Sequence, residues 1–245
     1  MKKAIYDDND FFHNYIDLRN ADFNYNDMIE QPIVFALLGD VTEKSVLDVG
    51  CGYGSMTAKL VDAGARSVVG IDVSENMIAK AKRENARANA RYLVMDAVDL
   101  SSLNEKFDAI VSCLAIHYIE DLHSLFTSLY AMLEEGGCFV FSMEHPMYTA
   151  SREAQRWQKD ENGHFIGFVT DSYNLEGVRN IPWLGKVVEK YHHTVSSVIN
   201  ALLESGFRLE RVEEPKPTEE MLRNVQKTER ELHRPAYLIV KCRKG

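Results

Sequence analysis

Short, almost uniformly apolar runs alternate with amphipathic stretches from residue 45 onward. A strand that is apolar on both faces is typical of a parallel sheet covered by helices on both sides. The alternation of such strands with helices predicts a doubly wound α/β sheet. The predicted strands are Ser45–Gly50, Ser67–Asp72, Tyr92–Met95, Phe107–Ser112 and Cys138–Met143.

Helical periodicity fills the intervals between these strands. Ser74 suits the N-cap of a helix that runs to about Ala88, because Met77, Ile78 and Ala81 repeat at helical spacing. The other predicted helices span Ser55–Ala63, Leu122–Leu133, Thr194–Glu204 and Glu219–Leu232, and two closing strands span Phe207–Val212 and Tyr237–Cys242.

The alternation breaks between residues 146 and 193. This stretch contains scattered Gly, Pro, Trp and Tyr, no clear helix face, and two possible strands, Phe165–Thr170 and Lys186–Tyr191. Because it is too long and too aromatic for a simple loop, we expect an inserted substrate lid after the fifth strand. We expect residues 1–245 to form a single domain in which residues 1–40 also cover the ligand site.

The charge of the chain argues against a nucleic-acid partner. The sequence has 28 Lys and Arg against 37 Asp and Glu, a formal net charge of −9, whereas duplex binding normally needs a basic face. Residues 1–40 and 146–193 together hold 14 of the 24 aromatic residues, and the second stretch is net neutral. These two stretches therefore suit an apolar pocket for a small-molecule substrate.

Two further features concern the compartment. No apolar run approaches the length of a membrane span, and residues 1–12 lack the apolar core of a signal peptide. We therefore expect a cytoplasmic protein, monomeric or homodimeric, with no membrane partner. No Cys-x-x-Cys pair occurs, which favours reduced thiols without structural zinc; the four cysteines are Cys51, Cys113, Cys138 and Cys242.

A glycine-rich turn follows the first predicted strand, with the sequence Asp48-Val49-Gly50-Cys51-Gly52-Tyr53-Gly54. A phosphate-binding Walker A loop is excluded, because Gly54 is followed by Ser and Met instead of Lys and Ser or Thr. The dinucleotide pattern G-x-G-x-x-G is weakened by serine at position 55. The turn resembles the first motif of the class I S-adenosylmethionine-dependent methyltransferases.

The resemblance extends over roughly residues 26–145. Acidic residues stand at the ends of the second and third strands (Asp72 and Asp96), and Ser112–Tyr118 follows the fourth. These features occur in the family's order at the carboxyl ends of successive strands, where open α/β sheets bind ligands. The resemblance implies a mostly parallel, seven-stranded, Rossmann-like methyltransferase fold that converts S-adenosylmethionine to S-adenosylhomocysteine.

The resemblance also implies roles for individual residues. Asp48 would lie near the ammonium group of the methionine half, Asp72 would hold the ribose, and Asp96 would face the adenine edge with the Ala97 amide. Tyr25 is a candidate for closing over the methionine end. The remaining implied cofactor contacts are Gly50, Cys51, Gly52 and Cys113 at the methionine half, and Val73 and Met77 at the adenine face.

Three histidines near the open end of the sheet are candidate catalytic residues. His117 follows the fourth strand and His145 the fifth, whereas His192 lies where the insertion returns to a helix. Methyl transfer needs a general base only when the acceptor is a hydroxyl or a protonated amine. The adjacent His192 and His193 do not suggest a metal site, because neighbours on a strand point to opposite sides.

Three other functions compete with a small-molecule methyltransferase. An NAD(P)-linked oxidoreductase would share the fold and Asp72, although Ser55 and Asp96 count against it. A cofactor-binding protein without transfer activity would share the whole cofactor motif. A nucleic-acid methyltransferase is disfavoured by the charge and by the absence of an Asn/Asp-Pro-Pro-Tyr/Phe tetrapeptide after the fourth strand.

Overall fold

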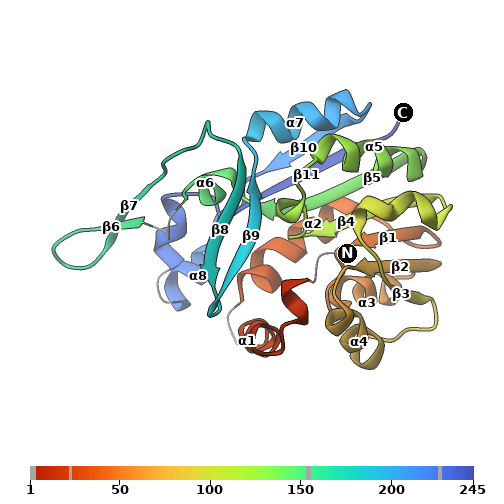
Figure 1. Ribbon diagram of the computed structural model, residues 1–245, viewed down its shortest axis with the longest axis horizontal. Coiled ribbons are helices and arrows are strands. Elements are labelled where there is room, and N and C mark those ends of the chain that lie inside the picture. The colour runs from red at the N-terminus through yellow and green to blue at the C-terminus, as the bar shows by residue number, and fades with distance from the viewer. Residues whose placement is uncertain (1–3, 22–23, 153–155, 226–227) are drawn as a thin grey trace.

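A seven-stranded sheet forms the centre of the protein (Figure 1). The computed structural model describes residues 4–21, 24–152, 156–225 and 228–245. The strands follow the order β10-β11-β5-β4-β1-β2-β3 across the sheet. Their bounds are β1 Ser45–Val49, β2 Ser67–Asp72, β3 Ala90–Val94, β4 Phe107–Cys113, β5 Leu133–Glu144, β10 Arg208–Glu213 and β11 Tyr237–Arg243.

Strands β1 to β5 form the parallel part of this sheet. β1 pairs with β2 and with β4, β3 pairs with β2, and β5 pairs with β4. β11 is antiparallel to β5, and β10 is antiparallel to β11. The predicted doubly wound, mostly parallel methyltransferase sheet is confirmed, and the carboxyl ends of its parallel strands share one edge.

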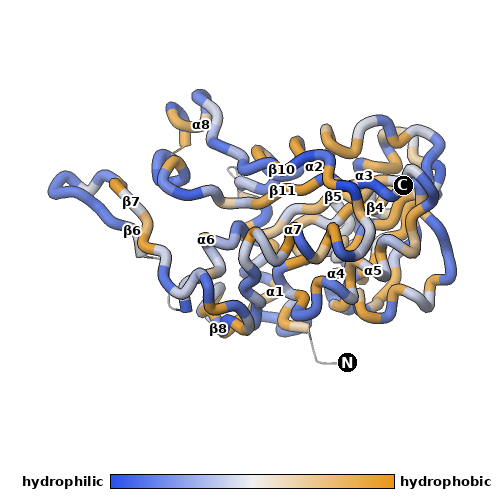
Figure 2. The backbone as a smooth tube through the Cα atoms, turned by 90° about the horizontal axis from the view of Figure 1, so that it is seen from above, coloured by the Kyte–Doolittle hydropathy of each residue, from blue (hydrophilic) through white to orange (hydrophobic). Residues whose placement is uncertain are grey.

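Helices cover both faces of the sheet, as its apolar strands require. On β1, Leu47 belongs to the core under α5 (Leu122–Met132) and α7 (Val195–Glu204), whereas Val46 belongs to the core under α2 (Gln31–Leu38) and α3 (Ser55–Asp62). Figure 2 shows hydrophobic residues along these central strands. The remaining helices are α1 Asn9–Arg19, α4 Glu75–Glu84, α6 Pro146–Thr149 and α8 Glu219–Asn224, with the 3₁₀ helices η1 Ile5–Asp7, η3 Ala97–Leu103, η4 Ile116–Tyr118 and η5 Thr228–Leu232 and the π-helix η2 Asn26–Glu30.

The predicted start of α4 is confirmed, whereas its predicted end near Ala88 is wrong, because the helix ends at Glu84. The Ser74 side chain accepts the Met77 backbone N–H at 3.2 Å and starts α4. The predicted helix Glu219–Leu232 is wrong as one element, because it consists of α8 and the separate turn η5. Among the helices that the structure describes, none combines the length and apolarity that a membrane span needs.

The described residues of the 146–193 stretch (146–152 and 156–193) form α6 and two antiparallel hairpins. The first joins β6 (Arg156–Lys159) to β7 (Phe165–Val169) and projects from the rest of the molecule (Figure 1). The second joins β8 (Gly177–Trp183) to β9 (Lys186–His192) and contacts η4. The predicted strands correspond to β7 and β9, whereas β6 and β8 were not predicted. Asn180 and Pro182, residue types that are rare in strands, conceal β8 in the sequence.

Candidate active site

A cavity of about 850 Å³ opens at the carboxyl ends of the parallel strands. The turns after β1 to β4, the N-terminal segment, the β8–β9 hairpin and the segment before β11 form its wall. All eleven residues that the sequence suggested for cofactor contacts line it: Tyr25, Asp48, Gly50, Cys51, Gly52, Asp72, Val73, Met77, Asp96, Ala97 and Cys113.

The glycine turn presents bare backbone to this cavity. Gly50, Gly52 and Gly54 have φ angles of 73°, 54° and 83°, which favour glycine. A Cβ atom at position 50 would collide with the Cβ of Ala115, and one at position 54 would lie 2.5 Å from the Tyr92 hydroxyl. The turn therefore requires glycine at these two positions both for its backbone conformation and for space.

Asp72 fixes the turn from the end of β2. Its Oδ2 accepts the Gly52 backbone N–H and its Oδ1 accepts the Ser74 backbone N–H, both at 2.9 Å. Burial raises the pKa of Asp72 to about 6, although these two hydrogen bonds oppose the shift. Each oxygen accepts one of these bonds and keeps a lone pair for a ligand hydroxyl.

Asp48 lies deeper, on β1, and is 1% exposed. Its Oδ2 accepts the Thr57 hydroxyl at 2.6 Å, whereas its Oδ1 has no hydrogen-bond partner among the residues described. Burial raises the pKa of Asp48 to about 7, against the effect of the Thr57 hydrogen bond. An orphaned, buried carboxylate oxygen in a cavity wall is suited to a cationic ligand.

The N-terminal segment adds a second buried acid, Glu30, which the sequence analysis did not single out. The Ser142 hydroxyl donates to its Oε1 at 2.5 Å, and its Oε2 has no hydrogen-bond partner in the described part of the chain. Burial raises the pKa of Glu30. Two acids, Asp48 and Glu30, thus contribute unpartnered oxygens to one cavity.

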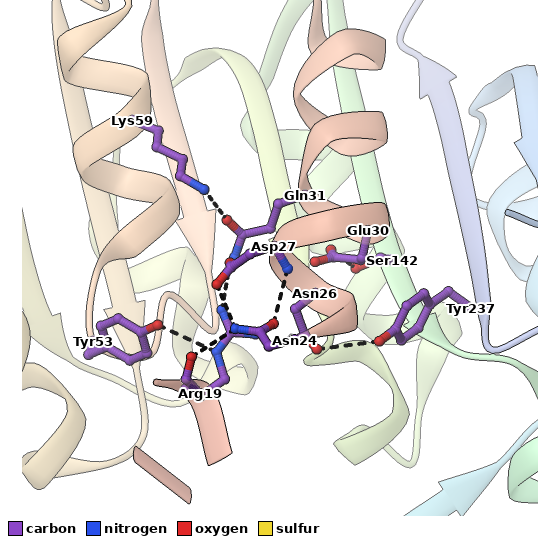
Figure 3. Close-up of polar contacts among 10 residues, drawn as sticks. All are labelled: Arg19, Asn24, Asn26, Asp27, Glu30, Gln31, Tyr53, Lys59, Ser142 and Tyr237. Carbon is purple, nitrogen blue, oxygen red and sulfur yellow. Dashed lines mark hydrogen bonds and ion pairs between the residues drawn. The ribbon is translucent and has the colours of Figure 1, made fainter. Parts of the chain in front are cut away.

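Arg19 at the end of α1 is another cavity residue that sequence reasoning missed (Figure 3). Its guanidinium donates to Asn24 at 3.1 Å, to Asp27 at 3.0 Å and to the Tyr53 hydroxyl at 3.4 Å. Figure 3 also shows the Tyr237 hydroxyl bonded to Asn26 at 3.3 Å. No sequence signal marked Arg19, because its partners come from three places: the segment before η2 (Asn24), η2 itself (Asp27) and the glycine turn (Tyr53).

The N-terminal segment and the insertion contact each other beside the cavity. Trp183 at the tip of the β8–β9 hairpin packs edge-on against Phe11 and Tyr15 of α1, with ring centroids 5.5 and 6.0 Å apart. Lys186 pairs with Asp8 at 2.9 Å at the same junction. The two aromatic stretches therefore form adjoining parts of one wall.

Of the three candidate histidines, His117 lines the cavity. Its Nδ1 accepts the Glu144 backbone N–H at 3.3 Å, so that in the neutral ring the proton resides on Nε2. Burial lowers the pKa of His117 to about 4, and the ring is therefore neutral at physiological pH.

His145 and His192 are not among the cavity-lining residues, which corrects the expectation that they face the pocket. His145 caps α6 by accepting the Met147 N–H at 3.1 Å, and its Nε2 contacts Glu214 at 2.8 Å. His192 bonds to Thr149 at 2.9 Å and to the Tyr173 carbonyl at 2.8 Å. His193 does not line the cavity either. The ring nitrogens of His145 and His192 thus have partners within the fold.

Glu144, which precedes His145 at the end of β5, does line the cavity. Its Oε1 accepts the Lys190 ammonium at 2.5 Å, and its Oε2 lies 4.0 Å from His117 Nε2 without a hydrogen-bond partner among the described residues. Burial opposes ionisation, yet the Lys190 charge outweighs it and lowers the pKa of Glu144. Glu144 is thus an ionised carboxylate of the cavity wall, and its buried Oε2 has no hydrogen-bond partner among the described residues.

Within the described ranges, no group of three His, Cys, Asp or Glu side chains is arranged to hold a metal ion.

This chain is similar in sequence and structure to known methyltransferases. The sequence profile described as "Methyltransferase domain" matches residues 46–137. A protein of Haemophilus influenzae whose function is uncharacterized is 33% identical over 99% of this chain and 98% of its own length. The crystal structure of an S-adenosylmethionine-dependent methyltransferase from Mesorhizobium loti is 37% identical, covers 87% of this chain and 96% of its own, and superposes with a TM-score of 0.79.

Another solved structure, from Listeria monocytogenes, is 34% identical, covers 88% of this chain and 96% of its own, and has a TM-score of 0.81. These two matches cover 87% and 88% of this chain, so they extend well beyond residues 46–137 of the profile match. The chain therefore belongs to the family of class I S-adenosylmethionine-dependent methyltransferases, enzymes whose cofactor is S-adenosylmethionine.

Proposed function

We propose that the protein transfers a methyl group from S-adenosylmethionine to a small-molecule acceptor bound in the same cavity. The observation that carries this proposal is the continuity of the cavity from the glycine turn to Glu144, Tyr148, Trp183 and Arg234. Its volume of about 850 Å³ lies high in the range of small-molecule sites, which leaves space beside a cofactor for a second small ligand.

The cofactor half of the cavity fits a cation that carries a ribose. Asp72 offers lone pairs on both oxygens for the ribose hydroxyls, and the orphaned oxygens of Asp48 and Glu30 suit positive charge. Gly52 leaves space beside the backbone, because a Cβ atom there would meet only Met77 Sδ at 4.0 Å. The Arg19 guanidinium suits the carboxylate of the methionine half. When bound, S-adenosylmethionine supplies a methyl group that its sulfonium centre already activates.

The remaining residues proposed to contact the cofactor lie in the same cavity wall. Asp96, which caps η3 by accepting the Val98 N–H at 3.1 Å, suits the adenine edge together with the Ala97 amide. Val73 and Met77 suit the adenine face. Cys51, Gly52, Cys113 and Tyr25 complete the proposed set near the methionine half.

The acceptor half must position a nucleophile and exclude water, since displacement at a methyl group needs close alignment. The unpartnered Oε2 of Glu144 accepts a hydrogen bond from a hydroxyl or amine of the acceptor, and the Nε2–H of neutral His117 orients the same group. Lys190 positions Glu144 through their 2.5 Å ion pair. The β8–β9 hairpin and α1, joined at Trp183, cover this half as a lid.

The proposal is tested with methyl-labelled S-adenosylmethionine and a cell extract fractionated by size. Label should enter the small-molecule fraction, and label confined to protein or nucleic acid would contradict a small acceptor. Glu144→Gln should greatly reduce this transfer. The matched control is Glu135→Gln on the same strand, whose side chain is 82% exposed at the opposite end of β5, and it should retain transfer.

A further inference from the structure

The cavity wall before β11 holds a buried guanidinium that the proposed methyl transfer does not use. Arg234 lines the cavity, and its side chain is 3% exposed. Its Nη1 donates to the Pro235 carbonyl at 3.1 Å, whereas its Nε has no partner among the described residues. Because a guanidinium has five N–H donors and buried donors are costly when unpaired, this arrangement is suited to a ligand.

Aromatic rings hold this guanidinium in place. Its central carbon lies 4.6 Å from the ring centroid of Tyr148 and 5.0 Å from those of Trp157 and Phe168. These rings come from α6, β6 and β7, so the insertion fixes a side chain that belongs to the C-terminal segment. Cation–π contacts stabilise the charge without using its hydrogen-bond donors. Apart from the Nη1 donor bonded to Pro235, the donors of Arg234 thus lie in a fixed position without a hydrogen bond to the described residues.

The charges around Arg234 do not balance. Glu231 Oε1 accepts Arg230 Nε at 2.8 Å, and its Oε2 lies 3.6 Å from Arg234 Nη2, beyond hydrogen-bond distance. Among these three described side chains, one carboxylate thus serves two guanidinium groups, which leaves one positive charge. Two other arginines of the described chain line the cavity: Arg230 shares Glu231, whereas Arg19 has its own carboxylate at 3.0 Å.

We propose that Arg234 binds an anionic group of the acceptor, and that the acceptor is a small organic monoanion, a carboxylate with an apolar body. This inference rests on the proposed function. A carboxylate matches the planar donors of a guanidinium and neutralises the single excess charge, whereas a phosphate monoester would bring a second negative charge. Tyr148 and Trp183 in the same wall suit the apolar body.

The test uses benzoate, its neutral isostere benzamide, and phenyl phosphate, each titrated calorimetrically into protein saturated with S-adenosylhomocysteine. Wild-type protein should bind benzoate at least about tenfold more tightly than benzamide, the ratio expected for a hydrogen-bonded charge pair. Arg234→Gln should abolish this preference. Arg223→Gln, whose side chain on α8 is 69% exposed, is the matched control and should preserve it.

Equal affinity of wild-type protein for benzoate and benzamide would overturn the proposal, as would a preference that survives in Arg234→Gln. Tighter binding of phenyl phosphate than of benzoate would overturn the assignment of a monoanion. If Arg234→Gln does not fold, the Nε–H resonance of Arg234, identified by its loss in Arg234→Lys, gives a second measurement on wild-type protein. Benzoate should shift this resonance, and no shift at saturation would refute the contact.

The same titrations separate this inference from the proposed function. Protein that binds S-adenosylhomocysteine but shows no preference for benzoate refutes the Arg234 site and leaves the methyltransferase proposal intact. Protein that does not bind S-adenosylhomocysteine contradicts the proposed cofactor site itself.

Discussion

Substitution of Asp48 by asparagine should stabilise the cofactor-free protein at neutral and alkaline pH. Asparagine keeps the shape of the side chain and an oxygen that accepts the Thr57 hydroxyl, which donates to Asp48 at 2.6 Å. It removes the buried negative charge, whose other oxygen has no hydrogen-bond partner in the described chain. The same charge is what we propose for binding the ammonium group of the cofactor, so stability and binding should change in opposite directions.

The magnitude follows from the pKa of Asp48, which burial raises from 3.8 to about 7. An acid whose pKa is higher in the folded state binds more protons when folded, so stability falls as pH rises from about 4 to about 7. At about 1.4 kcal/mol per pH unit, this group removes about 3 kcal/mol of stability between pH 5 and pH 8. Asparagine does not titrate in this range, so the Asp48→Asn variant should lose none of this stability.

The assay is urea unfolding of both cofactor-free proteins at about pH 5 and pH 8. Asp72 and Glu30 also have raised pKa values, but they are common to both proteins and cancel in the comparison. The stability advantage of Asp48→Asn should therefore grow with pH. An advantage that is the same at both pH values, or a variant less stable than wild type at pH 8, would refute the assigned burial cost.

Three more tests concern the two halves of the cavity. Gly50→Ala should abolish binding of S-adenosylhomocysteine and lower the free energy of unfolding by about 1–3 kcal/mol, since its Cβ collides with Ala115; wild-type affinity in a titration would contradict this. Affinity for S-adenosylhomocysteine should rise up to about tenfold from pH 6 to pH 8 as Asp48 ionises, and equal affinities would count against its role. His117→Gln should lower kcat without changing cofactor affinity. Because the pKa of His117 is about 4, this residue should add no inflection near pH 6.5 to the pH profile of kcat/KM. The profiles of wild type and His117→Gln should therefore have the same shape in that range.

The cofactor half of the site could be predicted from the sequence because its determinants are local. Asp48, the glycine turn and Asp72 stand at strand ends, and parallel pairing of β1 with β2 and β4 brings those ends together. Once the strands are recognised, their neighbours in space follow. No sequence motif marks Arg19, because its position depends on how α1 packs against the rest of the fold.

The acceptor half could not be predicted, because its residues come from segments with no regular pattern. Arg234 is held by rings of the β6–β7 hairpin and α6, and Lys190 reaches Glu144 from β9. The positions of His145 and His192 outside the cavity wall could not be predicted for the same reason. His145 stands at a strand end, as predicted, but a cap on α6 and a contact with Glu214 turn its ring away from the cavity wall.

Calorimetric titration of S-adenosylhomocysteine is the most direct test of the cofactor site on which the whole assignment depends. Wild-type protein should bind one molecule per chain, and Asp72→Ala should weaken binding by about 1–3 kcal/mol, the effect of losing hydrogen bonds to a charged group. Asp99→Ala, an exposed position outside the cavity, should bind like wild type. No binding at about millimolar concentration, or equal affinity of Asp72→Ala and wild type, would contradict the proposed site.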